Sequence, residues 1–299
     1  MTEPGELPLA PGLYLVATPI GNLGDMTLRA LDVLRRADRI ACEDTRQTQK
    51  LLNHFQIATP TESCHEHNER ECAARLVEML KAGSRIALVS DAGTPGVSDP
   101  GKLLIAAAIE AGVAVIPIPG PNAAITALIA SGLPMEEFTF LGFLPEKAGA
   151  RRTRLEELRA ENRGAIKTLI FYEAPHRILE TLEDLQAVFG AETRIAVARE
   201  LTKLHEEFLR GTVAQVRAEL AGRDRIRGEI TLLVETPALP AGLEAADAAK
   251  SVAQRVAEFL QEGLDEKDSL KRLAKEMGQS KSDLYRELQR ERAAARGRR

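Results

Sequence analysis

Three short clusters of ionisable residues could carry out acid–base chemistry. The first is Glu43-Asp44-Thr45-Arg46, which ends a predicted strand over 39–43. Two neighbouring carboxylates beside a guanidinium group suit a general base for a hydroxyl group, or a pair that holds a sugar. The same residues could begin a helix, with the acids at its positive end and Asp44 as its cap. We favour a catalytic role for Glu43, Asp44 and Arg46, which does not exclude the cap.

The second cluster is HEHNE at 65–69, at the next predicted junction between a strand and a helix. A histidine titrates near neutral pH, so His65 could act as the base or hold a sugar, with Asn68 beside it. Asn68 could equally cap the following helix, with Glu71 three positions later completing a capping box.

Cys64 and Cys72 flank this cluster, so a zinc site has to be weighed. The spacing C-H-x-H-x4-C matches no standard finger or ribbon pattern, and we therefore expect no metal. Together with Cys42 they form neither a CxxC pair nor an even set, which predicts reduced thiols in a reducing compartment.

The third cluster is RELTK at 199–203, at the end of another predicted strand. Lys203 could lower the proton affinity of a hydroxyl group or hold a phosphate, and Glu200 could orient it. A surface ion pair explains the two residues equally well.

Three loops rich in glycine and proline follow predicted strands: ATPIGN at 17–22, SDAGTP at 90–95 and PIPGPN at 117–122. In an open α/β sheet, loops at the carboxyl ends of the strands line the ligand crevice, and small residues let the backbone approach a ligand. Together the loops suggest a nucleotide-like ligand, although each alone could be simple turn chemistry. None contains GxGxxG or GxxxxGK[ST], so neither a dinucleotide fingerprint nor a P-loop is supported.

The elements that must position these residues alternate between strand and helix patterns. A first α/β domain is predicted over 12–120, with strands at 13–18, 39–43, 85–90 and 113–118 and helices at 27–37, 68–80 and 103–111. This alternation predicts a parallel sheet covered on both faces.

A second α/β domain is predicted over 121–236. Its expected strands are 138–143, 166–172, 193–200, 206–212 and 229–235, with helices at 123–131, from 151 onward and at 176–189. The stretch at 206–212 leaves room for an antiparallel strand. A linker with prolines and a glycine is predicted over 237–244.

The remainder, 245–299, is predicted to be a small all-α domain. Leu270, Leu273 and Ala274 share one helical face, Gly278 ends that helix, Ser280 caps the next, and Leu284 and Leu288 face back. This is a helix-turn-helix-like pattern with basic residues at both ends. A solvated helical bundle is the alternative, and we place the nucleic-acid role slightly ahead.

Charge is unevenly distributed along the chain. The net charge is -4, yet 264–299 holds eleven Lys and Arg against seven Asp and Glu. This argues against indiscriminate coating of nucleic acid and for a local phosphate-seeking surface. The 299 residues contain no apolar run of about 18 residues and no basic-then-apolar start, so we expect a cytosolic protein without a membrane span.

The chain resembles the tetrapyrrole methylase family of class III methyltransferases over roughly 12–235. Within that family it is most similar to the branch that methylates a cytidine ribose 2'-hydroxyl in 16S ribosomal RNA. The motifs that carry this resemblance are VATPIGNLGDMTLRA, ACEDTR, HEHNE, LVSDAGTPGVSDPG, PGPNAAITAL, LIFYEAPHR and ARELTK. Ala92, where corrinoid-type relatives carry the Pro of Gly-Asp-Pro, and the inserted GTPGVSDPG disfavour a corrinoid substrate.

The resemblance implies two α/β domains with S-adenosyl-L-methionine in the cleft between them. The residues it implies for donor binding are Pro19, Ile20, Asp91, Gly93, Thr94, Val97, Ala123, Ala124, Tyr172, Glu173 and Ala174. It also implies a homodimer acting on a decoding-centre cytidine of 16S rRNA within the assembled small ribosomal subunit.

Aromatic residues make up only 4% of the chain, so we expect shape and phosphate contacts to dominate RNA recognition. The predicted phosphate partners are Arg151, Arg152, Arg154, Lys271, Lys275, Lys281 and the arginines of the tail. Two alternatives stay open: a methyltransferase for a tetrapyrrole or corrinoid, and a DNA-binding regulator whose α/β body senses a small molecule.

Overall fold

A computed structural model describes residues 8–65, 67–162, 166–236, 251–261, 264–277 and 280–296, without the side chains of 275–277 and 293–296. The chain divides into two compact units, Met1–Pro237 and Ala238–Arg299. The larger unit contains two five-stranded sheets with their helices, and the smaller unit is helical.

The first sheet is parallel throughout and has the strand order β3-β2-β4-β1-β5. Its strands are β1 (Gly12–Val16), β2 (Arg39–Cys42), β3 (Thr61–Ser63), β4 (Arg85–Leu88) and β5 (Val115–Ile118). The segments between them are the short 3-10 helix η1 (Leu23–Asp25) and the helices α1 (Leu28–Arg36), α2 (Thr45–His54), α3 (Glu69–Lys81) and α4 (Lys102–Glu110). The prediction of a parallel α/β sheet is confirmed.

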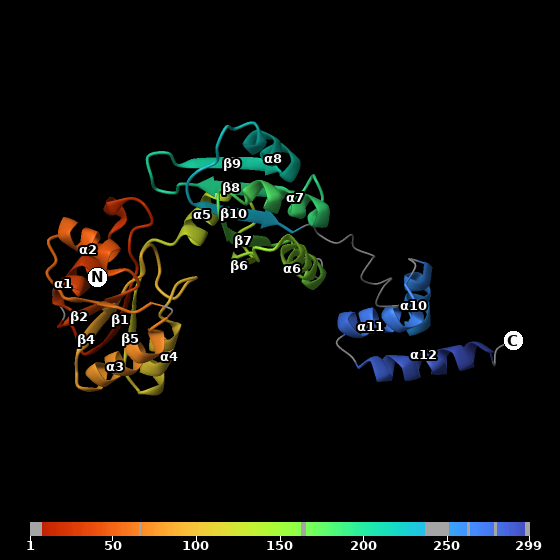
Figure 1. The fold of residues 1–299 in the computed structure, drawn as a ribbon, viewed down its shortest axis with the longest axis horizontal. Helices are drawn as coiled ribbons and strands as arrows, with labels where there is room; N and C mark the ends of the chain where they lie inside the picture. The colour runs from red at the N-terminus through yellow and green to blue at the C-terminus, as the bar shows by residue number, and fades with distance from the viewer. Residues whose placement is uncertain are drawn as a thin grey trace. The chain divides into compact units, whose positions relative to one another are not determined.

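Helices cover both faces of this sheet (Figure 1). Along β1, Tyr14 and Val16 pack in the apolar cluster that contains the buried residues of α1 and α2. Leu13 packs on the other face with α3 and α4, and Leu15 lies against the same cluster. This alternation follows from the two-residue period of a strand, and it explains why the strand is apolar at every position.

The second sheet is mixed and has the order β6-β7-β10-β8-β9. Its strands are β6 (Phe138–Phe143), β7 (Thr168–Glu173), β8 (Arg194–Arg199), β9 (Glu207–Thr212) and β10 (Ile230–Glu235). Its helices are α5 (Ala123–Ser131), α6 (Ala148–Glu161), α7 (Ile178–Phe189) and α8 (Val213–Ala221). Strand β9 is antiparallel to β8, and β10 is antiparallel to both of its neighbours, β7 and β8.

The two faces of the second sheet pack differently. Helices α6, α7 and α8 build a large apolar core on one face. On the other face α5 packs through Ala124, Ala127 and Leu128, and Ile20 from the loop after β1 joins the same cluster. The loop after β1 is therefore packed against the second sheet. This contact fixes its position where the two sheets meet.

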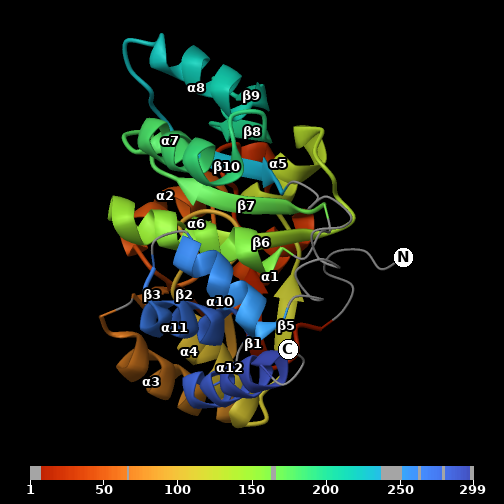
Figure 2. The ribbon, with the colours of Figure 1, turned by 90° about the vertical axis from the view of Figure 1, so that its right-hand side faces the viewer.

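The helical unit contains α10 (Val252–Gln261), α11 (Glu266–Met277) and α12 (Lys281–Arg296). Each helix packs against the other two, as the blue part of Figure 2 shows. The predicted apolar face is confirmed, because Leu270, Leu273, Leu284 and Leu288 are buried in one core, with Ala274 packed against it. Ser280 caps α12 by accepting from the Asp283 amide at 3.2 Å.

Some predictions for this part fall outside the described residues. These are the linker over 237–244, the glycine at 278 and the side chain of Lys275. Helix α10 precedes the predicted pair, so the described residues of this unit form three helices that pack together. None of the helices in the described ranges is long and apolar enough to cross a membrane.

The predicted capping box at Asn68 is wrong. Asn68 stands at the N-cap of α3, but its side chain makes no capping bond. Its oxygen instead accepts from the His65 amide at 2.8 Å, and its Nδ2 donates to the Ser63 carbonyl at 3.1 Å. The side chain is consumed in holding the turn before α3.

Arg151 is also misassigned as a phosphate partner. Its side chain is only 1% exposed, and its Nε donates to Asp184 at 2.7 Å. Arg152 binds the same carboxylate at 2.8 Å, and Arg154 pairs with Glu157 and Glu161. Helix α6 also begins three residues before the predicted start at 151. Arg151 and Arg152 therefore join α6 to α7, whereas Arg154 is paired within its own helix.

Candidate active site

The three glycine- and proline-rich loops meet. Thr18 and Gly93 exchange backbone hydrogen bonds of 2.9 and 3.0 Å. The Thr94 hydroxyl donates to the Pro121 carbonyl at 3.2 Å and accepts from the Asn122 amide at the same distance. The loops after β1, β4 and β5 are thus bonded into one wall.

Glycine is required where two of these loops come closest. A Cβ added at Gly120 would lie 2.9 Å from the Cβ of Ala17, a distance that real Cβ atoms do not reach. Gly93 has φ +83°, a conformation that favours glycine, and a Cβ there would lie 3.3 Å from Ile20. These contacts explain why small residues recur in the loops.

A cavity of about 380 Å³, the central cavity, lies between this wall and the second sheet. Its volume is in the range of small-molecule sites. Eight of the eleven residues predicted to bind the donor line it: Ile20, Gly93, Thr94, Val97, Ala123, Tyr172, Glu173 and Ala174. Pro19, Asp91 and Ala124 are not among its lining residues, although each is next in sequence to one that is.

The sequence analysis missed part of the lining. Asp99, Asn122, Phe143 and Leu201 contribute to the cavity, and so does the segment 228–231. Asp99 lies in the inserted GVSDPG, whose presence was noted without a role. The segment 228–231 begins β10, and no local pattern shows that this strand lies in the middle of the sheet.

Aromatic and ionisable side chains give the cavity its character. Tyr172 packs edge to face with Phe140 and Phe143, at ring-centroid distances of 5.0 and 5.7 Å. Burial raises the pKa of its hydroxyl, and the nearby Asp99 carboxylate raises the pKa further. Such an apolar wall with a few polar groups suits an aromatic base.

Glu173 lines the cavity, but its carboxylate is bound within the protein. Its carboxylate is buried and accepts from the Ala174 amide, the Arg177 guanidinium and the Thr181 hydroxyl at 2.6 to 2.9 Å. Ala174 and Arg177 belong to the turn that joins β7 to α7, and Thr181 lies in the first turn of α7. The side chain therefore fixes the turn that lines the cavity.

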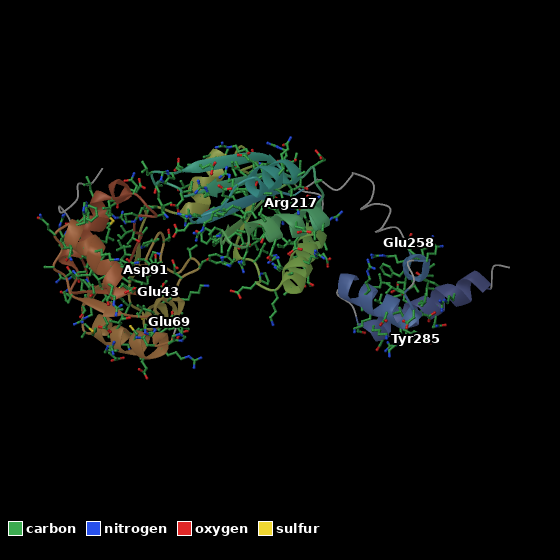
Figure 3. All side chains as sticks on the ribbon, turned by 45° about the horizontal axis from the view of Figure 1, so that its top comes forward. Glu43, Glu69, Asp91, Arg217, Glu258 and Tyr285 are labelled. Carbon is green, nitrogen blue, oxygen red and sulfur yellow. The ribbon has the colours of Figure 1, made fainter. Side chains whose placement is uncertain are left out.

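Four carboxyl groups gather at one edge of the first sheet. Burial, together with the charges of Glu43 and Asp91, raises the pKa of Asp99 to about 6. Burial also raises the pKa of Asp91, whose Oδ1 accepts from the Asp44 amide at 3.3 Å. Figure 3 labels Glu43 and Asp91 on this part of the chain. The predicted acids at 43 and 44 are thus connected to the cavity through Asp91 and Asp99.

The cap interpretation of Asp44 is confirmed, and its catalytic role stays a prediction. Its Oδ1 accepts from the Arg46 amide at 2.8 Å, so it caps α2. Asp44 and Arg46 are nevertheless exposed, and their side chains are accessible to a ligand beside the cavity. The cap leaves the second carboxylate oxygen of Asp44 for other contacts.

His65 lies on the same side of the sheet, after β3, and does not line the cavity. Its Nδ1 is buried and has no hydrogen-bond partner among the described residues. Its ring meets that of His67 at a centroid distance of 5.9 Å. Asn68 fixes the His65 backbone, which gives Asn68 a positioning role here.

Glu200 and Lys203 are bound to each other. Lys203 Nζ contacts Glu200 Oε1 and Glu229 Oε2, both at 2.9 Å. The stem of Lys203 fills the space over Gly21, where a Cβ would lie 2.9 Å from Cε of the lysine. This pair therefore joins the loop after β1 to the beginning of β10 and does not line the central cavity.

The three cysteines are free and buried. A hydrogen bond between the thiols of Cys64 and Cys72 raises the pKa of Cys64 and lowers the pKa of Cys72. No group of three or more His, Cys, Asp or Glu residues in the described ranges is placed to hold a metal ion.

Comparison with known proteins decides the family. The model of the tetrapyrrole (corrin/porphyrin) methylases matches residues 12–217. The chain belongs to the tetrapyrrole methylase family. Its fold agrees, because the methylase resembles the crystal structure of the methyltransferase CobJ with a TM-score of 0.55 at 20% identity, over 75% of this chain and 94% of that one.

Two curated relatives match the methylase almost from end to end. A protein of Halalkalibacterium halodurans is 50% identical over 91% of this chain and 93% of its own. One of Mesorhizobium japonicum is 46% identical over 96% of this chain and 94% of its own. Both are named ribosomal RNA small subunit methyltransferase I. The methylase is accordingly an enzyme of the methyltransferase class.

Proposed function

We propose that the methylase transfers a methyl group from S-adenosyl-L-methionine to the ribose 2'-hydroxyl of a decoding-centre cytidine in 16S rRNA. Two observations together carry the proposal: the size and walls of the central cavity, and the names of the relatives. A cavity walled by three bonded loops has the size for a nucleoside-like donor, and relatives of matching length are named for methylation of small-subunit rRNA.

The residues of the central cavity fit this donor. Tyr172 and Phe143 offer apolar faces for an adenine ring, and the loop backbones offer polar groups without bulky side chains. The Asp99 carboxylate supplies a negative charge for a cationic ligand. The donor would supply a methyl group on a sulfonium sulfur.

The protein has to align the hydroxyl oxygen with that methyl group and remove a proton. Alignment in a site that excludes water accounts for much of the rate in such displacements. Asp44 is the best placed of the predicted bases, because it is exposed and bonded through its amide to Asp91 beside the cavity. Glu43, Arg46 and His65 are proposed to hold the ribose around it.

The proposal includes three further expectations: action on the assembled small subunit, a cytoplasmic setting and a homodimer. Ile125 and Ile129 on α5 are 44% and 68% exposed, which leaves apolar surface for a contact between copies. Light scattering of the purified chain gives the oligomeric state directly.

Site mapping of methyl groups tests the function. Small ribosomal subunits from cells that lack the enzyme are incubated with the purified chain and labelled S-adenosyl-L-methionine. We expect label in one 2'-O-methylcytidine of 16S rRNA, identified by nuclease digestion and mass spectrometry. Labelling of a precorrin in a parallel reaction, with none in RNA, would overturn the proposal.

A further inference from the structure

Two further cavities adjoin the central cavity, and several arginines line them. One, of about 390 Å³, and another, of about 590 Å³, share one wall, the loop Arg223–Gly228 that joins α8 to β10. Gly228 lines all three cavities, and Pro175 lines both the central and the larger one. The loop therefore lies directly beside the central cavity.

Two of the arginines at this place are committed to the fold. Arg199 and Arg223 both bind Glu207, at 2.9 Å and at 2.7 and 2.8 Å. The two guanidinium groups hold the pKa of Glu207 down to about 2. Their charges are thus largely matched within the protein.

The other two arginines are uncommitted. Arg225 and Arg227 are exposed, and their side chains make no hydrogen bond or ion pair with any residue that the structure describes. Ile226 between them packs against the core of the second sheet. Asp224 is the one acidic residue of the loop Arg223–Gly228. Glu200, which lines the smaller cavity with this loop, is already paired with Lys203.

The loop is held in place, so these two charges have a defined position. Arg199 Nη1 donates to the Arg227 carbonyl at 3.1 Å, and Glu200 Oε1 accepts from the Glu229 amide at 3.0 Å. Gly228 has φ +90°, and a Cβ there would lie 2.6 Å from that same Oε1. Glu200 and Gly228 therefore act as positioning residues for the loop.

We propose that Arg225 and Arg227 bind backbone phosphates of the RNA next to the nucleotide whose ribose faces the central cavity. Arginine forks match phosphate oxygens in two-bonded geometry, and phosphate contacts set the position of a nucleic acid without reading its sequence. The sequence analysis placed the phosphate contacts on α6 and the tail and overlooked this loop. The inference rests on the proposed RNA substrate and adds the subsite that positions it.

The test compares Arg225→Ala, Arg227→Ala and the double variant with Arg217→Ala. Arg217, labelled in Figure 3, lies on α8 and loses the same charge away from these cavities. For each protein, binding to small ribosomal subunits is measured at several salt concentrations, together with kcat, KM and the calorimetric affinity for S-adenosyl-L-methionine.

We expect each loop variant to weaken subunit binding and raise KM about tenfold, with donor affinity and kcat nearly unchanged. The double variant should reduce the slope of log K against log salt by about 1 to 2, while the Arg217 variant keeps it. A double lysine variant should keep the slope and lose less affinity, because it retains the charge without the fork.

The outcomes separate this inference from the proposed function. If the unaltered enzyme methylates RNA and the double alanine variant matches the Arg217 control, the subsite is wrong and the function stands. If the enzyme binds subunits through these arginines without methylating them, the function is wrong and the subsite stands. Absence of subunit binding by the unaltered enzyme overturns both.

Discussion

Asp99 is the ionisable side chain on the cavity wall with the most perturbed proton affinity. Its pKa of about 6 results from burial and from the neighbouring acids Glu43 and Asp91. A raised carboxyl pKa means that the folded protein disfavours the charged form. A cation bound in the cavity would reverse that preference, so the group is suited to a positively charged ligand.

This argument predicts a pH-dependent donor affinity. S-adenosyl-L-methionine should bind with full affinity above about pH 7 and lose affinity as the pH falls through 6, where Asp99 takes up a proton. Asp99→Asn should bind more weakly at neutral pH and show a flatter profile. Calorimetry over this range checks it, with S-adenosylhomocysteine, which lacks the sulfonium charge, as the matched ligand. An unchanged profile in the variant would remove Asp99 from donor binding.

A substitution at Asp44 can remove the charge of its carboxylate and still keep the cap of α2. Asparagine caps helices as well as aspartate does, so Asp44→Asn should leave stability and donor affinity intact. If Asp44 is the base, kcat should fall about 100-fold or more. Single-turnover methylation of small subunits measures the step. Full activity in the variant would assign the base elsewhere, and His65→Ala would then be the next variant.

At the scale of elements, the sequence specified the local structure well and the pairing of distant strands poorly. The strands lie close to their predicted ranges where they are short apolar runs that end at glycine, proline or acids. Strand β3 (Thr61–Ser63) had no predicted range, because its three residues are polar. The position of β10 between β7 and β8 could not be predicted, since an apolar strand carries no mark of its partner. The cavity residues at 228–231 and the arginine loop were missed for this reason.

Helix contacts show the same division. The apolar faces of the tail were predictable from their spacing. The burial of Arg151 was not, because a charged residue near a helix start is usually exposed, and its partner Asp184 lies 33 residues away. A tertiary contact decided the outcome at Arg151, whereas hydrogen bonds within the turn before α3 decided it at Asn68.

The ion pair between α6 and α7 gives a prediction about stability. Asp184→Ala leaves the buried Arg151 without its main partner and should lower the free energy of unfolding by about 3 kcal/mol. Arg152→Ala removes the half-exposed arginine from the same carboxylate and should cost less than about 1 kcal/mol. Urea denaturation of both variants is the measurement. Equal losses would contradict the importance assigned to burial.

At the scale of the whole molecule, the helical unit has a core of its own. Among the residues that the structure describes there, seven buried apolar side chains from α10, α11 and α12 form this core. Caps at Ser251 and Ser280 begin two of its helices. These features support folding of each unit without the other.

A chain that ends at Pro240 tests the role of that unit. Because the central cavity is built within 20–231, the shortened protein should bind S-adenosyl-L-methionine with unchanged affinity. Its affinity for small ribosomal subunits should fall about tenfold or more, through loss of the basic helices. Filter binding and calorimetry give the two values. Methylation of subunits at the full rate by the shortened chain would show that the tail has no part in recognition.

Strand β10 is the last to be made of the strands that the structure describes, yet it occupies the centre of its sheet. During translation, β7 and β8 cannot be joined in one sheet until β10, which pairs with both, has been made. The wall at 228–231 is therefore completed only when almost all of the α/β part has left the exit tunnel. A partly synthesised chain therefore lacks one wall of the central cavity until β10 has been made.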